Sequence, residues 1–147
     1  MTDLYAMTAD ELTSFVISLG EPKFRAAQIA SFLKSGVPID EMTNLPKSLR
    51  EKLKETTLDT LPRVEEKLVS KIDGTVKYLF RLHDGECIES VFMRYHHGNT
   101  ICISSQVGCR MGCRFCASTL AGRVRDLLPS ELLGQIIAAE RDMGERV

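Results

Sequence analysis

The stretch Cys102-Ile-Ser-Ser-Gln-Val-Gly-Cys109-Arg-Met-Gly-Cys113-Arg-Phe-Cys116 holds four of the five cysteines of this 147-residue chain. The last three follow the spacing C-x3-C-x2-C, and Cys102 stands seven residues upstream of them. Clustered cysteines in a reducing compartment indicate metal binding or catalysis more than structural disulfides. This segment therefore carries the strongest information on both the fold and the chemistry.

Two metal sites fit the spacing. Three thiolates on one short loop can hold three irons of a cubane [4Fe-4S] cluster and leave the fourth iron open, and an aromatic residue before the last cysteine, here Phe115, is typical of radical S-adenosylmethionine enzymes. The alternative is a structural zinc site made by all four cysteines. Zinc sites usually combine two C-x2-C knuckles and this segment has one, so the spacing favours iron–sulfur over zinc.

The composition is that of an ordinary globular chain, with 44% hydrophobic and 27% charged residues and a net charge of −1. No global positive field attracts nucleic acid, so any RNA contact needs a local patch. One such patch is predicted from four arginines with no acidic residue among them: Arg110, Arg114, Arg123 and Arg125. The alternative is that these arginines balance cluster charge or pair with acidic residues in a barrel that this chain does not complete.

The first 60 residues have the pattern of a small helical domain. Thr8-Ala-Asp-Glu11 has the spacing of a capping box, and Gly20 is a suitable helix end. Pro22 opens a second apolar segment that ends near Gly36, and Pro46 stands where a third helix would begin. The N-terminus lacks a signal-peptide pattern and no stretch approaches a membrane span, so a cytoplasmic protein with no membrane contact is expected.

Residues 61–94 read as a connecting β-meander. The pairs Asp73-Gly74 and Asp84-Gly85 separate segments rich in β-formers and predict tight hairpin turns. A further strand over 100–104 leads into the cysteines, residues 109–122 read as a loop, and Pro129-Ser130 opens an amphipathic helix that Gly144 can end. Residues 95–147 thus have the order of a first βα unit that is not closed into a sheet or barrel.

A specific resemblance adds to this pattern. "CISSQVGCRMGCRFCASTLAGRVRDL" and "SELLGQI" resemble the RlmN/Cfr-type radical S-adenosylmethionine RNA methyltransferases, with the adenine-C2 branch of dual specificity for ribosomal and transfer RNA as the nearest match. "GEPKFRAAQI", "MTNLPKSLREKL", "DGTVKYLFRL" and "IESVFMR" resemble that family in the same order. Family members are more than twice as long. The resemblance therefore implies an α+β fold: a helical accessory domain, a meander, and the start of a truncated (β/α)6 radical enzyme barrel.

The resemblance also implies roles for individual residues. Cys109, Cys113 and Cys116 match the cluster ligands, and the backbone of Phe115 would contact the adenine of S-adenosylmethionine. Cys102 matches a catalytic thiol that is not a ligand. Glu89 matches the residue that accepts the C2 proton, and it lies with Cys102 near facing ends of adjacent predicted strands. Without the resemblance, Glu89 would be interpreted as a solvated carboxylate and Cys102 as a buried strand cysteine. Cys87 matches no site of the family and is interpreted as a packing residue of its strand.

The implied reaction is methylation of adenine C2 in 23S rRNA and tRNA through a methyl-cysteine whose position lies beyond Val147. It implies an external electron donor and a monomer at full length, and the 147-residue chain alone is expected to be inactive. Two alternatives remain: a zinc- or cluster-stabilised RNA-binding module without catalysis, and the C8-methylating branch of the same family. Both branches share Glu89, Cys102 and the helical domain, so these residues separate them poorly.

Overall fold

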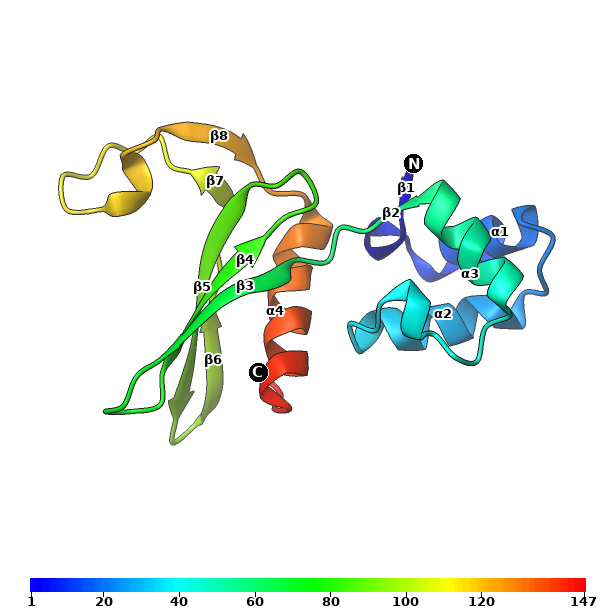
Figure 1. Cartoon of the computed structure of the whole chain (residues 1–147), viewed down its shortest axis with the longest axis horizontal. Coiled ribbons are helices and arrows are strands. Elements are labelled where there is room, and N and C mark those ends of the chain that lie inside the picture. Colours follow the sequence, from blue (N-terminus) through cyan, green and yellow to red (C-terminus); the bar gives the residue numbers. More distant parts are fainter. The chain divides into compact units, whose positions relative to one another are not determined.

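The computed structural model describes residues 1–147 and contains both helices and strands (Figure 1). The chain divides into two compact units, Met1–Thr60 and Leu61–Val147. None of its helices is both long enough and apolar enough to cross a membrane.

Unit 1 is a bundle of short helices closed by a pair of two-residue strands that run parallel. Its apolar core is continuous and includes Val16, Ile29, Leu49 and Leu53, none of which is exposed. The elements are β1 (Thr2–Asp3), η1 (Leu4–Ala6), α1 (Ala9–Ser18), α2 (Phe24–Lys34), η2 (Ile39–Glu41), α3 (Lys47–Thr56) and β2 (Thr57–Leu58).

The ends of α1 are those that its sequence predicts. The Thr8 amide donates to Glu11 Oε2 at 2.8 Å, and the Glu11 amide donates to Thr8 Oγ1 at 3.3 Å, which completes the capping box. Gly20 follows the helix with a φ of +80°, a conformation that glycine adopts without steric cost. The helical nature of residues 1–60 is therefore confirmed.

Unit 2 is built on an antiparallel sheet in the order β3-β4-β5-β6, with a separate antiparallel pair β7-β8. Both Asp-Gly turns are present: Gly74 and Gly85 take φ values of +71° and +89°, as predicted for the meander. The elements are β3 (Arg63–Val69), β4 (Val76–Arg81), β5 (Cys87–Tyr95), β6 (Gly98–Cys102), β7 (Gln106–Gly108), η3 (Ala117–Thr119), β8 (Arg123–Asp126) and α4 (Pro129–Met143).

Helix α4 lies along one face of the β3–β6 sheet (Figure 1). That covered face takes every second strand residue, among them Tyr78, Phe80 and Phe92, which are fully buried with Ala139 of α4. Burial of each large side chain contributes about 1.5–3 kcal/mol. The sheet and α4 therefore share a core, and the other face of the sheet, called the open face below, is free of helix.

Two details differ from the sequence prediction, and a third stays untested. The segment after the cysteines is not only a loop, because it includes η3 and is followed by β8, whose charged sequence RVRD carries no strand pattern. β6 ends at Cys102, two residues before the predicted strand end. The only parallel pairing within residues 1–147 is β1 with β2, so the barrel remains a prediction.

Candidate functional site

The three clustered cysteines lie on one loop, residues 109–122, called the cysteine loop below. The β7-β8 pair closes its base, and the Cys109 amide donates to the carbonyl oxygen of Gly122 at 3.1 Å. Gly108 has a φ of +69°, and a Cβ atom at this position would lie 1.9 Å from the same Gly122 oxygen. Only glycine permits this close approach of two backbones. The glycine at position 108 therefore fixes the geometry at the base of the loop.

The thiols on this loop are accessible. Cys113 is exposed, Cys109 and Cys116 are half-buried, and all five cysteines of the chain are free thiols. The Met111 amide lies 3.5 Å from Cys109 Sγ and donates to it, and the Cys116 amide donates to the Cys113 carbonyl at 3.1 Å. The loop backbone therefore contacts the Cys109 sulfur directly.

The donor set fits a cubane cluster. No three Cys, His, Asp or Glu side chains in residues 1–147 form a group that could hold one metal ion. A cubane does not need such a group, because each thiolate binds a different iron. The loop offers three soft sulfur donors and an amide hydrogen bond to one of them. The chemistry of these donors suits a cluster, and the ligand set of Cys109, Cys113 and Cys116 stays a prediction.

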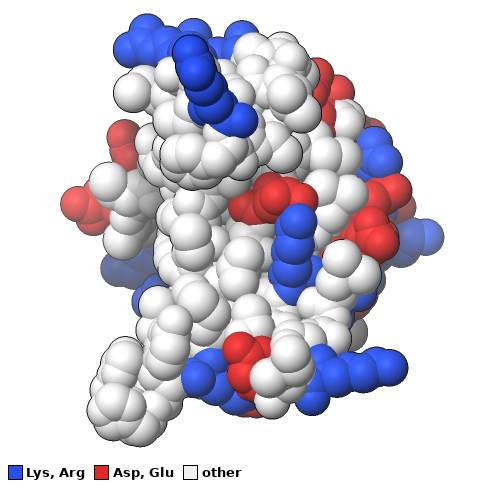
Figure 2. All heavy atoms as spheres, turned by 90° about the vertical axis from the view of Figure 1, so that its left-hand side faces the viewer, with Lys and Arg blue, Asp and Glu red and all other residues white.

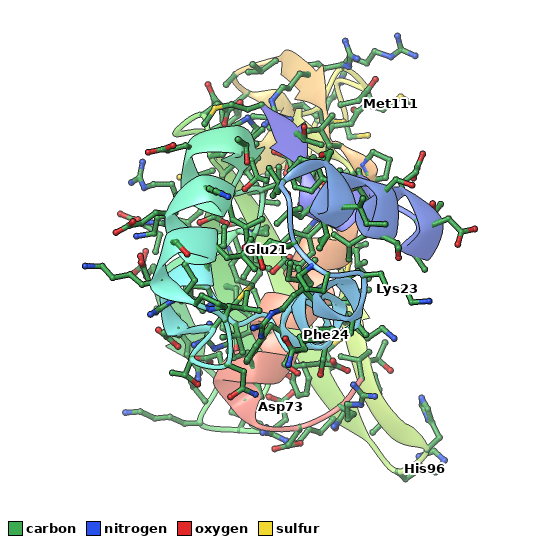
Figure 3. The ribbon with its side chains drawn as sticks, turned by 90° about the vertical axis from the view of Figure 1, so that its right-hand side faces the viewer. Glu21, Lys23, Phe24, Asp73, His96 and Met111 are labelled. Carbon is green, nitrogen blue, oxygen red and sulfur yellow. The ribbon has the colours of Figure 1, made fainter.

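The tip of the cysteine loop carries exposed apolar side chains. Phe115, Leu120 and Met111 are 94%, 86% and 73% exposed. Figure 3 shows Met111 at one end of unit 2 and His96, in the β5–β6 hairpin, at the other end. The loop and its predicted cofactor-binding residue therefore lie at the end of the sheet opposite the His96 hairpin.

Glu89 and Cys102 project from the open face of the sheet. Both side chains are exposed, and Cys102 pairs with Val91, so Glu89 is its diagonal neighbour on the adjacent strand. Diagonal neighbours of an antiparallel pair lie about 7–8 Å apart. Glu89 Oε1 forms an ion pair with Lys77 Nζ at 2.7 Å. The two residues to which the resemblance assigns proton and thiol chemistry thus share one face of two paired strands.

A cavity of about 550 Å³ lies between the end of the open face and the cysteine loop. Glu89 and Cys109 both line it, so the predicted proton acceptor and one predicted cluster ligand face the same space. Cys87, predicted to be a packing residue, is half-buried and also lines this cavity. Other parts of the wall come from the segment after β6 and from η3: Ile103, Ser104, Ser105, Ala117 and Ser118.

Comparisons with known proteins agree with this arrangement. Residues 2–58 match the family model described as the ribosomal RNA large subunit methyltransferase N-terminal domain. A probable dual-specificity RNA methyltransferase RlmN of Lachnospira eligens is 56% identical over 149 aligned residues, which cover 100% of this chain. The chain belongs to the RlmN family. Similar RlmN proteins include that of Alkaliphilus oremlandii, 52% identical over 99% of this chain.

The RlmN match extends to a solved structure. A radical SAM methyltransferase from Sphaerobacter thermophilus superimposes with a TM-score of 0.87 and 37% identity, covering 100% of this chain and 45% of that protein. The chain spans 43% of the length of both RlmN relatives named above. The family and the mixed α/β fold of a radical SAM methyltransferase are thus established for this part of an RlmN protein.

Two of the four predicted RNA-binding arginines of this RlmN chain are held in ion pairs. Arg123 binds Asp126 at 2.6 Å, and Arg125 binds both Asp84 and Glu131 at 2.8 Å. Arg110 and Arg114 are exposed on the cysteine loop. Figure 2 shows a mostly uncharged face on which acidic groups adjoin basic ones at a few places, near the centre and at the lower edge among them. The partners of Arg123 and Arg125 thus lie within this chain, not in the rest of a barrel as the alternative expected, and RNA contact remains a prediction.

The RlmN motif SELLGQI places two polar side chains on the buried face of α4, which sequence analysis did not predict. Glu131 is unexposed, and its carboxylate accepts hydrogen bonds from both terminal nitrogens of Arg125 at 2.8 Å. It also accepts the Leu128 amide at 2.8 Å, which caps the start of the helix. Burial by itself would raise the pKa of Glu131, but the Arg125 and Leu128 hydrogen bonds outweigh it and hold that pKa below the ordinary value.

The second buried polar residue of this motif is Gln135. It lies one turn after Glu131 and is likewise unexposed. The sequence signal for both was their spacing of four residues, which puts them on one side of the helix. Leu133, an apolar residue of the same helix, is by contrast 47% exposed.

Proposed function

We propose that the full-length protein containing this chain is a radical S-adenosylmethionine methyltransferase that methylates C2 of adenine in 23S rRNA and tRNA. The observation that carries the proposal is the cavity that Glu89 and Cys109 line together, with Cys102 diagonal to Glu89 on the next strand. RlmN relatives named as dual-specificity RNA methyltransferases support the substrate class.

Cys109, Cys113 and Cys116 would hold the [4Fe-4S] cluster. When bound, the cluster supplies the electron that cleaves S-adenosylmethionine. The Phe115 backbone would lie against the adenine of that cofactor. Two observations support this assignment: the thiols are accessible on a loop whose base is closed, and the Met111 amide donates a hydrogen bond to Cys109 Sγ. An external electron donor completes the cofactor requirements.

Glu89 would accept the proton from C2 of the substrate adenine. Glu89 lines the cavity, and its carboxylate forms an ion pair with Lys77 at 2.7 Å. A general base must reach the proton it removes, and an exposed carboxylate at the cavity wall satisfies that condition. The target base must leave its stack to enter such a site, because its C2 edge is hidden in folded RNA.

Cys102 would resolve the covalent intermediate. Its thiolate would attack the sulfur of a methyl-carrying cysteine outside residues 1–147, so that a disulfide forms and the bond from that sulfur to the substrate carbon breaks. The carbon leaves with the electron pair of that bond and takes up a proton, which completes the methyl group. The external donor then reduces the disulfide to two thiols. An exposed thiol on the open face, free of any disulfide in this chain, supports that role.

Anaerobic assay of the full-length enzyme with S-adenosylmethionine, a reductant and adenine-containing rRNA or tRNA tests the proposal. Mass analysis of the digested RNA should yield 2-methyladenosine from both substrates, and iron and sulfide should be bound in cluster stoichiometry. One zinc with no iron and no methylated RNA would favour the RNA-binding module. 8-methyladenosine as the product would place the protein in the C8-methylating branch.

A further inference from the structure

We infer that Gln135 is a positioning residue, which holds the strand ends bearing Glu89 and Cys102 at a fixed separation from the cysteine loop. The inference rests on the proposed function and assigns to α4 a part in it. It starts from the segment Ile103–Ser105, which connects β6 to β7 and belongs to neither sheet. A connecting segment without strand partners must satisfy its backbone groups in another way.

Gln135 supplies the missing partner. Its Nε2 donates to the Ser104 carbonyl at 2.9 Å, and its Oε1 accepts the Ser104 amide at 2.9 Å. The side-chain amide thus bonds both backbone groups of Ser104, as a neighbouring strand would. Oε1 also accepts the Ser90 hydroxyl at 2.7 Å, and Nε2 donates to the Glu131 carbonyl at 3.2 Å. One unexposed side chain therefore joins α4, β5 and the β6–β7 connection.

Ser104 passes this constraint to the proposed base. Its hydroxyl donates to the backbone carbonyl of Glu89 at 2.6 Å, at the point where the β5–β6 ladder has ended. Ser104 is two residues after Cys102 and five before Cys109. Ser104 and Glu89 both line the cavity with Cys109. Loss of the Gln135 contacts would leave the segment Ile103–Ser105 free to move. The distances of Cys102 and Glu89 from the cysteine loop depend on this segment.

Packing alone does not explain a glutamine here. An apolar side chain of the same length would fill the space equally well but would leave the Ser104 amide and carbonyl without these partners. The four hydrogen bonds of Gln135 instead specify one geometry of the Ser104 backbone. A displacement of about 1 Å at a reacting group lowers a catalytic rate by as much as about 100-fold. We infer that these hydrogen bonds of Gln135 control the placement of Glu89 and Cys102.

The test compares Gln135→Met with Tyr78→Phe in the full-length enzyme. Methionine keeps the length of the side chain and removes all four hydrogen bonds. Tyr78 is a matched control, because its hydroxyl donates to Asp142 of α4 at 2.6 Å and ties the same helix to the same sheet away from the cavity. Three quantities are measured for each: bound iron, cleavage of S-adenosylmethionine, and the ratio of enzyme–RNA covalent adduct to methylated RNA.

Gln135→Met should keep bound iron and cofactor cleavage within about twofold of wild type, while release of methylated RNA falls by about 10-fold or more and adduct accumulates. Tyr78→Phe should leave the adduct ratio unchanged. Amide hydrogen exchange should be faster at Ser104 in Gln135→Met alone. An unchanged adduct ratio, or an equal loss of iron, cleavage and product, would overturn the inference. Absence of methylated RNA in the wild type would instead overturn the proposed function. In that case an unchanged exchange rate of the Ser104 amide in Gln135→Met would still refute the positioning role of Gln135.

Discussion

The two faces of the β3–β6 sheet differ in how strongly packing constrains the side chains on them. On the covered face, Tyr78, Phe80 and Phe92 are fully buried and their shapes are fixed by packing. On the open face, Lys77, Glu89 and Cys102 are exposed and little packing constrains them. Because successive strand residues alternate between faces, neighbours in sequence fall into these two classes. The fold depends on one face, and the proposed chemistry depends on the other.

This contrast predicts a separation of effects. Substitutions on the covered face should lower the free energy of unfolding, whereas those on the open face and the cysteine loop should change iron binding or the fate of RNA. The contacts of Gln135 link the two classes, since this buried residue of α4 bonds the backbone of Ser104, whose hydroxyl bonds the Glu89 carbonyl.

The largest effect on stability is expected from Phe92→Ala. Removing a fully buried aromatic side chain leaves a cavity, and the free energy of unfolding of unit 2 should fall by about 3–5 kcal/mol. Urea unfolding followed by circular dichroism measures this change. Val91→Ala, on the open face of the same strand, is the control and should cost no more than about 1.5 kcal/mol. Equal losses for both variants would mean that the open face is covered in solution.

A smaller loss is expected from Glu131→Gln. The amide cannot replace the ion pair with Arg125, so the free energy of unfolding should fall by about 2–3 kcal/mol at neutral pH. The folded pKa of Glu131 lies below its ordinary value of 4.5, so its stabilisation is present above that pH and is lost as pH falls through the folded value. Unfolding curves from pH 7 to 3 should therefore converge for wild type and variant. A constant difference over that range would contradict the assignment.

Cys113→Ala sharpens the comparison at the cysteine loop. Its side chain is exposed, so the free energy of unfolding should change by less than about 0.5 kcal/mol. Iron and sulfide retained after anaerobic reconstitution of the full-length protein should fall to a small fraction of wild type. Cys87→Ala is the matched control and should retain the cluster. Normal iron content in Cys113→Ala would remove this residue from the ligand set.

The smallest structural change is expected from Cys102→Ala. Stability and bound iron should stay within error of wild type, because this thiol is exposed and lies outside the ligand triplet. The full-length variant should still cleave S-adenosylmethionine and accumulate as an enzyme–RNA adduct, seen as a shifted band on a denaturing gel. Loss of iron in this variant would identify Cys102 as a ligand and favour a four-cysteine site.

Local sequence signals predicted much of the fold. The Thr8 capping box, the two Asp-Gly turns and Gly144 after α4 depend on contacts within a few residues, and the structure has all of them. β8 was not predicted, because its charged residues form a strand only by pairing with β7, more than ten residues away. Long-range pairing of this kind leaves no periodic pattern in the strand itself.

The candidate site was predictable only in part. The cysteine spacing and the motif resemblance identify individual residues, but the cavity shared by Glu89 and Cys109 depends on how the strands and the loop meet. Gln135 was missed because a polar residue in an amphipathic helix is ordinarily assigned to the solvent side. Its partner, the Ser104 backbone, lies 31 residues away in sequence, and no local pattern indicates that contact.

The glycine pair at the base of the cysteine loop has an entropic consequence. Gly108 and Gly122 let β7 and β8 close a segment of 14 residues, from 109 to 122, during folding of the chain. Joining the ends of a flexible segment of that length costs about 2 kcal/mol of chain entropy. Because folding of the protein already includes this cost, assembly of the proposed cluster would not add it again. The thiols start at a high effective concentration, and iron binding has only the short spans between them left to order.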